Sequence, residues 1–275
     1  MDIKASDVMK LRKMTQAGMM DCKKALVEAN GDYERAKELL REKGKLIAAK
    51  RSDRETSEGA VLARTNADNT KAVLVCLGCE TDFVSGTDGF QKLASDIADT
   101  AIANLPADVD ALKTCKVGNL TVEEAVTDQT GKSGEKHVLA CYEKIEAPYV
   151  GFYIHNNKKV ATIVGFSKKI ADEAVKEIAM QITAMVPVSV RKEDCPQSVI
   201  DKELQIYREE VAQEGKPAAI AERIVEGKLA KFFKERTLEE QVLALGDGKQ
   251  TVAQYLKGVD PEVKVVAFKR YSLSD

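Results

Sequence analysis

A carboxylate and an aromatic ring stand side by side at Asp82 and Phe83, within a run of small and polar residues from Gly78 to Gly89. A phenylalanine in such a loop either plugs the edge of a sheet, while the neighbouring aspartate makes a turn, or it probes another molecule. The residues alone leave both interpretations open.

Cys76 and Cys79 have the Cys-x-x-Cys spacing of a redox pair or of half a zinc site. The sequence has no second pair of this kind, and neither His137 nor His155 has the spacing of a zinc ligand. A redox pair is expected at the start of a helix, which lowers the thiolate pKa, whereas a long loop is predicted here. These observations disfavour a thiol oxidoreductase that uses this pair, which is kept only as an alternative. The six scattered cysteines favour buried residues in a reducing compartment.

The remaining candidate motifs predict no site for a small ligand. Gly131-Lys132-Ser133 resembles the end of a phosphate-binding loop, but Val126 stands where the leading glycine is required. We therefore expect no bound nucleotide, metal or cofactor. His137 follows a polar loop and receives no assignment, and a lone histidine such as His155 is most often a surface residue.

Composition limits the partners of this chain of 275 residues. Charged residues make up 31% of it and leave a net charge of −2, with no strongly one-signed segment. Direct nucleic-acid binding is therefore disfavoured. The start lacks a secretory pattern, and no apolar run approaches the ~20 residues of a membrane-spanning helix, so we expect a soluble, cytoplasmic protein without membrane contact.

Spacing of apolar residues predicts an α+β protein that begins with three short helices. Residues 1–46 should form a compact bundle of the ubiquitin-associated (UBA-like) type. Ser6 is expected to cap the first helix and Asp32 the third, with Asn30-Gly31 as a left-handed stop between the second and third. The polar residues 47–58 are expected to be a linker.

The rest of the chain predicts two related α/β subdomains, 59–140 and 141–275, each with a small antiparallel sheet and helices on one face. Each copy has two strands around a turn and then a helix that ends in an apolar residue followed by proline. The expected strands are 61–64, 71–76, 149–155, 159–166 and, at the end, 263–268; the expected helices are 90–105 and 171–186.

Two insertions break the repeat. A helical hairpin at 197–235, with its turn at Glu214-Gly215-Lys216-Pro217, is inserted in the second subdomain, and its apolar residues predict a stripe offered to another copy or to a partner. The loop 78–89 occurs only in the first subdomain. Since the shared scaffold does not need it, this loop is a candidate for function.

Several motifs together resemble the bacterial elongation factor Ts family. Thr81-Asp82-Phe83-Val84 is similar to that family's signature, and residues 17–26 are similar to its opening motif. Residues 178–182 and 224–229 also match, followed by Lys231-Phe232-Phe233, in the family's order. The resemblance covers nearly the whole chain.

The resemblance implies a non-enzymatic guanine nucleotide exchange factor that binds elongation factor Tu in its GDP form. Such a factor disturbs the Mg²⁺ site of elongation factor Tu and promotes GDP release so that GTP can rebind. By resemblance, Phe83 wedges between helices of the partner's G domain while Asp82 disturbs the Mg²⁺ environment, and Thr81 and Val84 complete the signature.

The resemblance also assigns docking on the G domain to Arg12, Met19, Met20 and Lys23 of the bundle. Two adjacent methionines at a helix start cannot both face one core, so at least one should be exposed. His155 is implied to lie where the second subdomain meets elongation factor Tu.

One expected absence and two open alternatives complete this interpretation. A further C-terminal helical module that some family members carry is expected to be absent, because the chain stops soon after Tyr271. A homodimer or a 2:2 complex is left open, and so is an adaptor that merely tethers partners through its UBA-like bundle.

Overall fold

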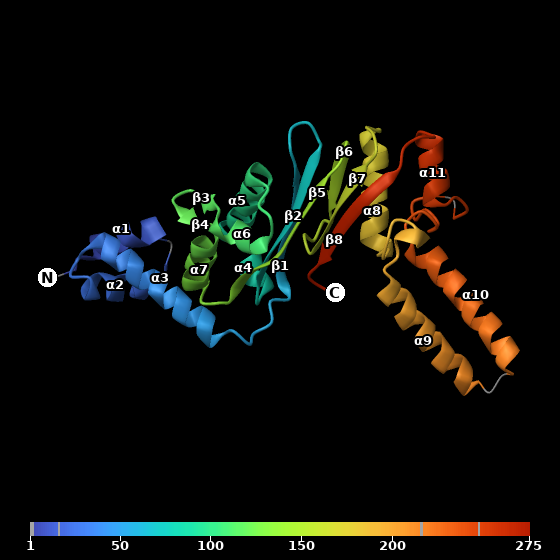
Figure 1. Cartoon of the computed structure of the whole chain (residues 1–275). Helices are drawn as coiled ribbons and strands as arrows, with labels where there is room; N and C mark the ends of the chain where they lie inside the picture. The colour runs from blue at the N-terminus through green and yellow to red at the C-terminus, as the bar shows by residue number, and fades with distance from the viewer. Residues whose placement is uncertain (1–2, 16, 215–216, 247) are drawn as a thin grey trace.

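The computed structural model describes residues 3–15, 17–214, 217–246 and 248–275. Figure 1 shows a helical bundle at one end of the molecule, two sheets in the middle and a pair of projecting helices at the other end. The predicted α+β class is confirmed.

The N-terminal bundle consists of α1 (Ala5–Thr15), α2 (Met19–Glu28) and α3 (Tyr33–Lys50). Apolar residues at helical spacing meet in a small core of their own: Val8, Leu11, Ala17, Cys22, Ala25, Leu26, Ala29 and Ala36. Three helices with a closed core confirm the predicted bundle.

Two of the three predicted helix signals in the bundle are confirmed. The Asp32 carboxylate accepts hydrogen bonds from the backbone N–H groups of Glu34 and Arg35, and Asn30 and Gly31 adopt φ values of 51° and 87°. The prediction of Ser6 as a cap is wrong, because α1 already begins at Ala5.

Helix α3 does not end where the linker was expected. It continues to Lys50, so it takes up the first four residues of the segment 47–58, and it crosses α7 (Val122–Ser133) at close range. A Cβ atom on Gly44 would lie 2.7 Å from the Thr127 carbonyl oxygen and 3.3 Å from the Gly131 nitrogen. An ion pair of 3.1 Å between Arg41 and Asp128 flanks the crossing. The bundle is therefore packed directly on the first subdomain.

Gly44→Ala is expected to lower the free energy of unfolding by about 1–3 kcal/mol, because the added methyl group meets backbone that cannot move aside cheaply. The matched control is Gly227→Ala in the exposed face of a later helix, where a Cβ atom meets nothing within 4 Å. That control should gain about 0.5–1 kcal/mol from helix propensity. Thermal unfolding followed by circular dichroism measures both, and a Gly44→Ala variant as stable as the parent would refute the close crossing.

The two subdomains contain sheets of the same strand order. The first sheet has the order β1-β2-β5 and the second β6-β7-β8, so each is an antiparallel hairpin joined on its second strand by a later strand. This confirms two related units. The strands are β1 (Glu58–Thr65), β2 (Lys71–Cys79), β5 (His137–Glu146), β6 (Tyr149–Ile154), β7 (Val160–Phe166) and β8 (Val265–Ser272).

One strand moves the expected boundary between the subdomains. Strand β5 crosses the position between residues 140 and 141, and it pairs with β2 along its length. A boundary in this region therefore falls between Glu146 and Tyr149.

Related helices cover the outer faces of the sheets. Helix α5 (Asp88–Asn104) packs on β1 and β2, and α8 (Asp172–Met185) packs on β6 and β7. Both helices end at an apolar residue in the left-handed region, Leu105 with φ 47° and Val186 with φ 46°, each before a proline. The other short elements are α6 (Val109–Thr114), β3 (Lys116–Val117), β4 (Leu120–Thr121), η1 (Lys192–Asp194) and α11 (Val252–Val259).

The inner faces of the two sheets pack against each other. Side chains from both, such as Leu74 and Ile163, form a common core, so the layers run helix, sheet, sheet, helix (Figure 1). This explains why β1 and β2 are buried on both faces and have continuous apolar runs.

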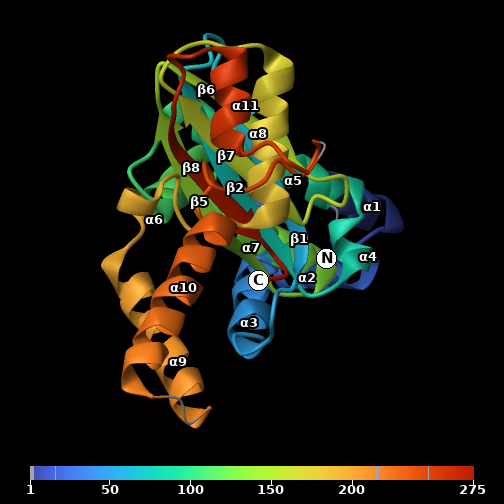
Figure 2. The ribbon, with the colours of Figure 1, turned by 90° about the vertical axis from the view of Figure 1, so that its right-hand side faces the viewer.

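The helical hairpin consists of α9 (Gln197–Gln213) and α10 (Ala218–Arg236), and it projects away from the second sheet in both Figure 1 and Figure 2. Pro217 lies just before α10, while Gly215 and Lys216 of the predicted turn are outside the described residues. Within the described ranges, no helix is long and apolar enough to cross a membrane.

Candidate functional site

The segment expected to be a long loop is mostly regular structure. Gly78 and Cys79 end β2, Asp82–Ser85 form a single helical turn, α4, and α5 begins at Asp88. The prediction of a loop over 78–89 is therefore wrong, although α4 has no counterpart between β7 and α8. The insertion in the first subdomain is a short, shaped turn.

Side chains on both sides of α4 hold it in place. Thr81 donates from its backbone N–H and its hydroxyl to the two carboxylate oxygens of Glu135, at 3.1 and 2.8 Å. Val84 packs against the core of the first subdomain. The Thr87 hydroxyl donates to the Val84 carbonyl oxygen at 2.8 Å. A turn of four residues cannot stabilise itself, so these contacts decide its position.

Phe83 is 86% exposed, more than any other large apolar side chain in the described part of the chain. Asp82 beside it is exposed as well. The interpretation of Phe83 as a plug for the sheet edge is therefore wrong. An anchored turn that holds an aromatic ring in solvent exposes apolar surface that a partner can bury.

Two hydrogen bonds hold Glu80, which lies two residues before α4. Arg51 Nη1 donates to Glu80 Oε2 at 2.7 Å, and the Lys136 backbone N–H donates to Oε1 at 2.6 Å. Burial alone would raise the pKa of this carboxyl group, but these hydrogen bonds and the charge of Arg51 outweigh it and lower the pKa below its ordinary value. Glu80 is therefore ionised at neutral pH.

His155 follows β6 in an exposed turn that lies close to α4. Its Nδ1 is 3.2 Å from the Tyr153 hydroxyl oxygen. Lys158 of the same turn donates to Gln91 Oε1 at 2.7 Å, and Gln91 Nε2 donates to the Ser85 carbonyl oxygen at 2.8 Å. Gln91 therefore joins the His155 turn to α4, although the two belong to different subdomains.

The predicted docking residues of the bundle lie on its surface. Met19 is 42% and Met20 62% exposed, so both methionines face solvent. Arg12 and Lys23 are exposed too. Met9 is 63% exposed as well, and the inward spacing of its neighbours Val8 and Leu11 is the signal in the sequence that points its side chain outward.

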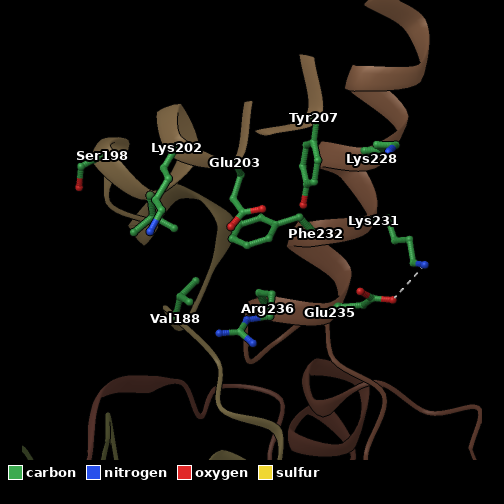
Figure 3. A pocket seen from close by; sticks show the side chains of 11 residues that line it. Val188, Ser198, Lys202, Glu203, Tyr207, Lys228, Lys231, Phe232, Glu235 and Arg236 are labelled. Atoms are coloured by element: carbon green, nitrogen blue, oxygen red, sulfur yellow. Dashed lines mark ion pairs between the residues drawn. The ribbon is translucent and has the colours of Figure 1, made fainter. Parts of the chain in front are cut away.

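The helical hairpin offers a narrower apolar surface than its sequence predicted. Phe232 and Phe233 are each 7% exposed, because they pack at the base of the two helices. A hollow of about 860 Å³ lies beside Phe232. Tyr207, lysines of both helices and Arg236 also line it, as Figure 3 shows. On the described part of the hairpin the exposed large apolar side chains are Ile206 and Ile220. Its contact with another copy or a partner stays a prediction.

The Cys-x-x-Cys pair does not form a site. Cys76 belongs to the core between the sheets, whereas Cys79 belongs to the core under α5, on the opposite face of β2. Burial raises the pKa of each thiol to about 12. These positions and protonation states contradict a thiol oxidoreductase that uses this pair.

Comparison with known proteins agrees with the signature at this turn. The family model for elongation factor TS matches residues 80–275, so the match begins at Glu80. An elongation factor Ts of Christiangramia forsetii is 48% identical over 273 residues, which cover 98% of each chain. The chain belongs to the elongation factor Ts family.

Two further elongation factor Ts proteins, from Amoebophilus asiaticus and Flavobacterium psychrophilum, are 46% and 44% identical over 273 residues. Both alignments cover 98% of each chain, so they include the bundle as well as the two subdomains. Membership of the elongation factor Ts family places this chain in translation elongation, a part of protein biosynthesis.

Proposed function

We propose that this chain is a guanine nucleotide exchange factor that binds elongation factor Tu with GDP and promotes GDP release. The observation that carries this proposal is the 86% exposure of Phe83 on an anchored turn. An aromatic side chain that is largely exposed in the free protein stabilises a complex when a partner buries it. The chain forms no covalent intermediate with its partner and acts as an exchange factor, not as an enzyme.

The mechanism follows from linkage between two ligands of elongation factor Tu. A GTPase of this kind holds GDP through phosphate-loop amides and a Mg²⁺ ion. An exchange protein that prefers the opened, Mg²⁺-free site weakens GDP binding. GDP must then weaken the binding of the exchange protein by the same ratio. GTP in excess then refills the emptied site.

Asp82 and Phe83 divide this work. The Phe83 ring enters between helices of the G domain, while the exposed Asp82 carboxylate disturbs the groups that surround the Mg²⁺ ion. Thr81 and Val84 hold the turn from either side, through Glu135 and the apolar core. His155 lies in the turn that Gln91 joins to α4, which supports a contact of the second subdomain with the same partner.

Release of fluorescent GDP from elongation factor Tu tests the proposal. The labelled complex is mixed with this chain and excess unlabelled nucleotide, and the fluorescence decay is followed by stopped flow. The proposal expects release to accelerate with the concentration of the chain and then to saturate. An unchanged release rate at micromolar concentrations would refute it, and an adaptor that only tethers partners would give that result.

The bundle is expected to dock and not to drive release. Met19→Ser with Met20→Ser removes two exposed apolar side chains at the start of α2. We expect the concentration for half-maximal release to rise about ten-fold, from the loss of about 1.4 kcal/mol of binding free energy, with the saturating rate within two-fold of the parent. Leu46→Ser on α3, where the leucine is 62% exposed, is the matched control and should change neither quantity. An equal fall in the saturating rate would contradict this division of labour.

A further inference from the structure

Two pairs of adjacent residues extend the first sheet beyond its last paired residues. The ladder between β2 and β5 ends at Cys79 and His137. Beyond it, Glu80 accepts from the Lys136 backbone N–H at 2.6 Å, and Thr81 donates twice to the Glu135 carboxylate. Side-chain hydrogen bonds thus continue the register after the backbone ladder stops. We call Glu80, Thr81, Glu135 and Lys136 the clasp.

The clasp replaces the usual start of a helix at α4. Thr81 is the residue before α4, but its hydroxyl accepts no capping bond from that helix and instead donates to Glu135. Both bonds from Thr81 end on a carboxylate, and such bonds are roughly twice as strong as neutral ones. Glu135 therefore fixes the backbone immediately before Asp82 and Phe83.

The clasp also holds the chain that leads out of the bundle. Lys136 Nζ donates to the carbonyl oxygens of Ser52 and Arg54 at 2.7 and 2.9 Å, and Arg51 donates to Glu80. Helix α7, on which α3 packs, ends at Ser133, two residues before Glu135. The bundle and the Phe83 turn are therefore attached to the same short segment of chain.

We propose that Glu135 is a positioning residue that holds the Phe83 turn in the geometry needed for nucleotide exchange. This inference rests on the proposed function for its meaning in exchange, but the effect on residue 83 itself is independent of any partner. Glu135 touches neither nucleotide nor metal and acts only through Thr81.

The partner-independent test uses the absence of tryptophan from the sequence. Phe83→Trp introduces the only tryptophan, at the exposed position, and its steady-state anisotropy, excited at a wavelength that tyrosine does not absorb, reports how firmly α4 is held. Adding Glu135→Ala should lower this anisotropy clearly, while Glu135→Gln, which keeps one carbonyl acceptor for Thr81, should fall in between. The matched control is Glu123→Ala at the start of α7, since the Glu123 carboxylate makes no hydrogen bond or ion pair within the described chain. Equal anisotropy in the parent reporter and in the Glu135→Ala variant overturns the proposal.

A double-mutant cycle then tests the consequence for exchange. With Phe83 present, Glu135→Ala should lower the efficiency of GDP release about ten-fold. With Asp82→Ala and Phe83→Ala already in place together, the same change should cost no more than about two-fold, because neither functional side chain of the turn remains to be positioned. A full ten-fold loss in both backgrounds overturns the proposal, since Glu135 would then act by another route. If the parent itself does not accelerate GDP release from elongation factor Tu, the proposed function fails, while the anisotropy result still decides the role of Glu135.

Discussion

Phe83→Ala is expected to lower the efficiency of GDP release from elongation factor Tu about thirty-fold. Aromatic side chains at the centre of an interface typically contribute on the order of 2 kcal/mol or more when truncated, and 1.4 kcal/mol corresponds to ten-fold. The ring is 86% exposed in the free protein, so its removal takes away no core packing. Stopped-flow release at several concentrations of the variant measures the effect.

Thermal melts separate this prediction from a loss of folding. The melting temperature of Phe83→Ala should equal that of the parent. By contrast, Val84→Ala, one residue along the same turn, should melt lower because Val84 packs against the core. Phe83→Leu, which keeps apolar bulk without a ring, should lie between alanine and the parent in activity. A Phe83→Ala variant that loses activity only in proportion to unfolding would contradict the wedge.

Asp82→Ala is expected to lower GDP release about ten-fold with Mg²⁺ present and far less once Mg²⁺ is chelated. The first figure corresponds to about 1.5 kcal/mol for one lost interaction of a charged group. The defect should shrink in chelator because the ion that the carboxylate helps to displace is already gone. Phe83→Ala should stay defective in both conditions, since the ring also displaces protein helices. The four release rates, two variants with and without Mg²⁺, decide between these roles.

Asp88→Ala is the matched control for the loss of a negative charge near α4. Asp88 is an exposed carboxylate at the start of α5, six residues after Asp82, and its side chain has no hydrogen bond or ion pair in the described part of the chain. Its replacement should leave the Mg²⁺ dependence of release unchanged. Equal behaviour of the two aspartate variants would mean that Asp82 acts only through general electrostatic attraction.

Elements with a strong periodic pattern could be predicted from sequence. The spacing of apolar residues in α5 and α8, the proline after each, and the two hairpins predicted two related units, although β5 crosses the boundary expected between residues 140 and 141. Asp32 was predicted as a cap because a carboxylate just before a periodic run can accept hydrogen bonds from the first backbone N–H groups of the helix. Ser6 is of a residue type that often caps helices, but it lies two residues after the cap position, inside α1.

The arrangement around Phe83 could not be predicted, because it depends on residues distant in sequence. Thr81 and Glu135 are 54 positions apart, and neither residue type suggests the other. The packing of α3 on α7 depends on Gly44 and Gly131, and glycines in a helical pattern suggest breaks and not close crossings. Whether Phe83 was a plug or a probe therefore required the positions of its neighbours in space.

The most direct test of exchange by linkage is the affinity of this chain for elongation factor Tu with and without bound GDP. Titration of each form at equal Mg²⁺ concentration gives two dissociation constants, and titration of GDP into elongation factor Tu with and without the chain gives two more. Linkage requires the two ratios to be equal, and the account predicts that both exceed ten-fold, with GDP and the chain opposing each other. Equal affinity for the GDP-bound and the nucleotide-free form would contradict it.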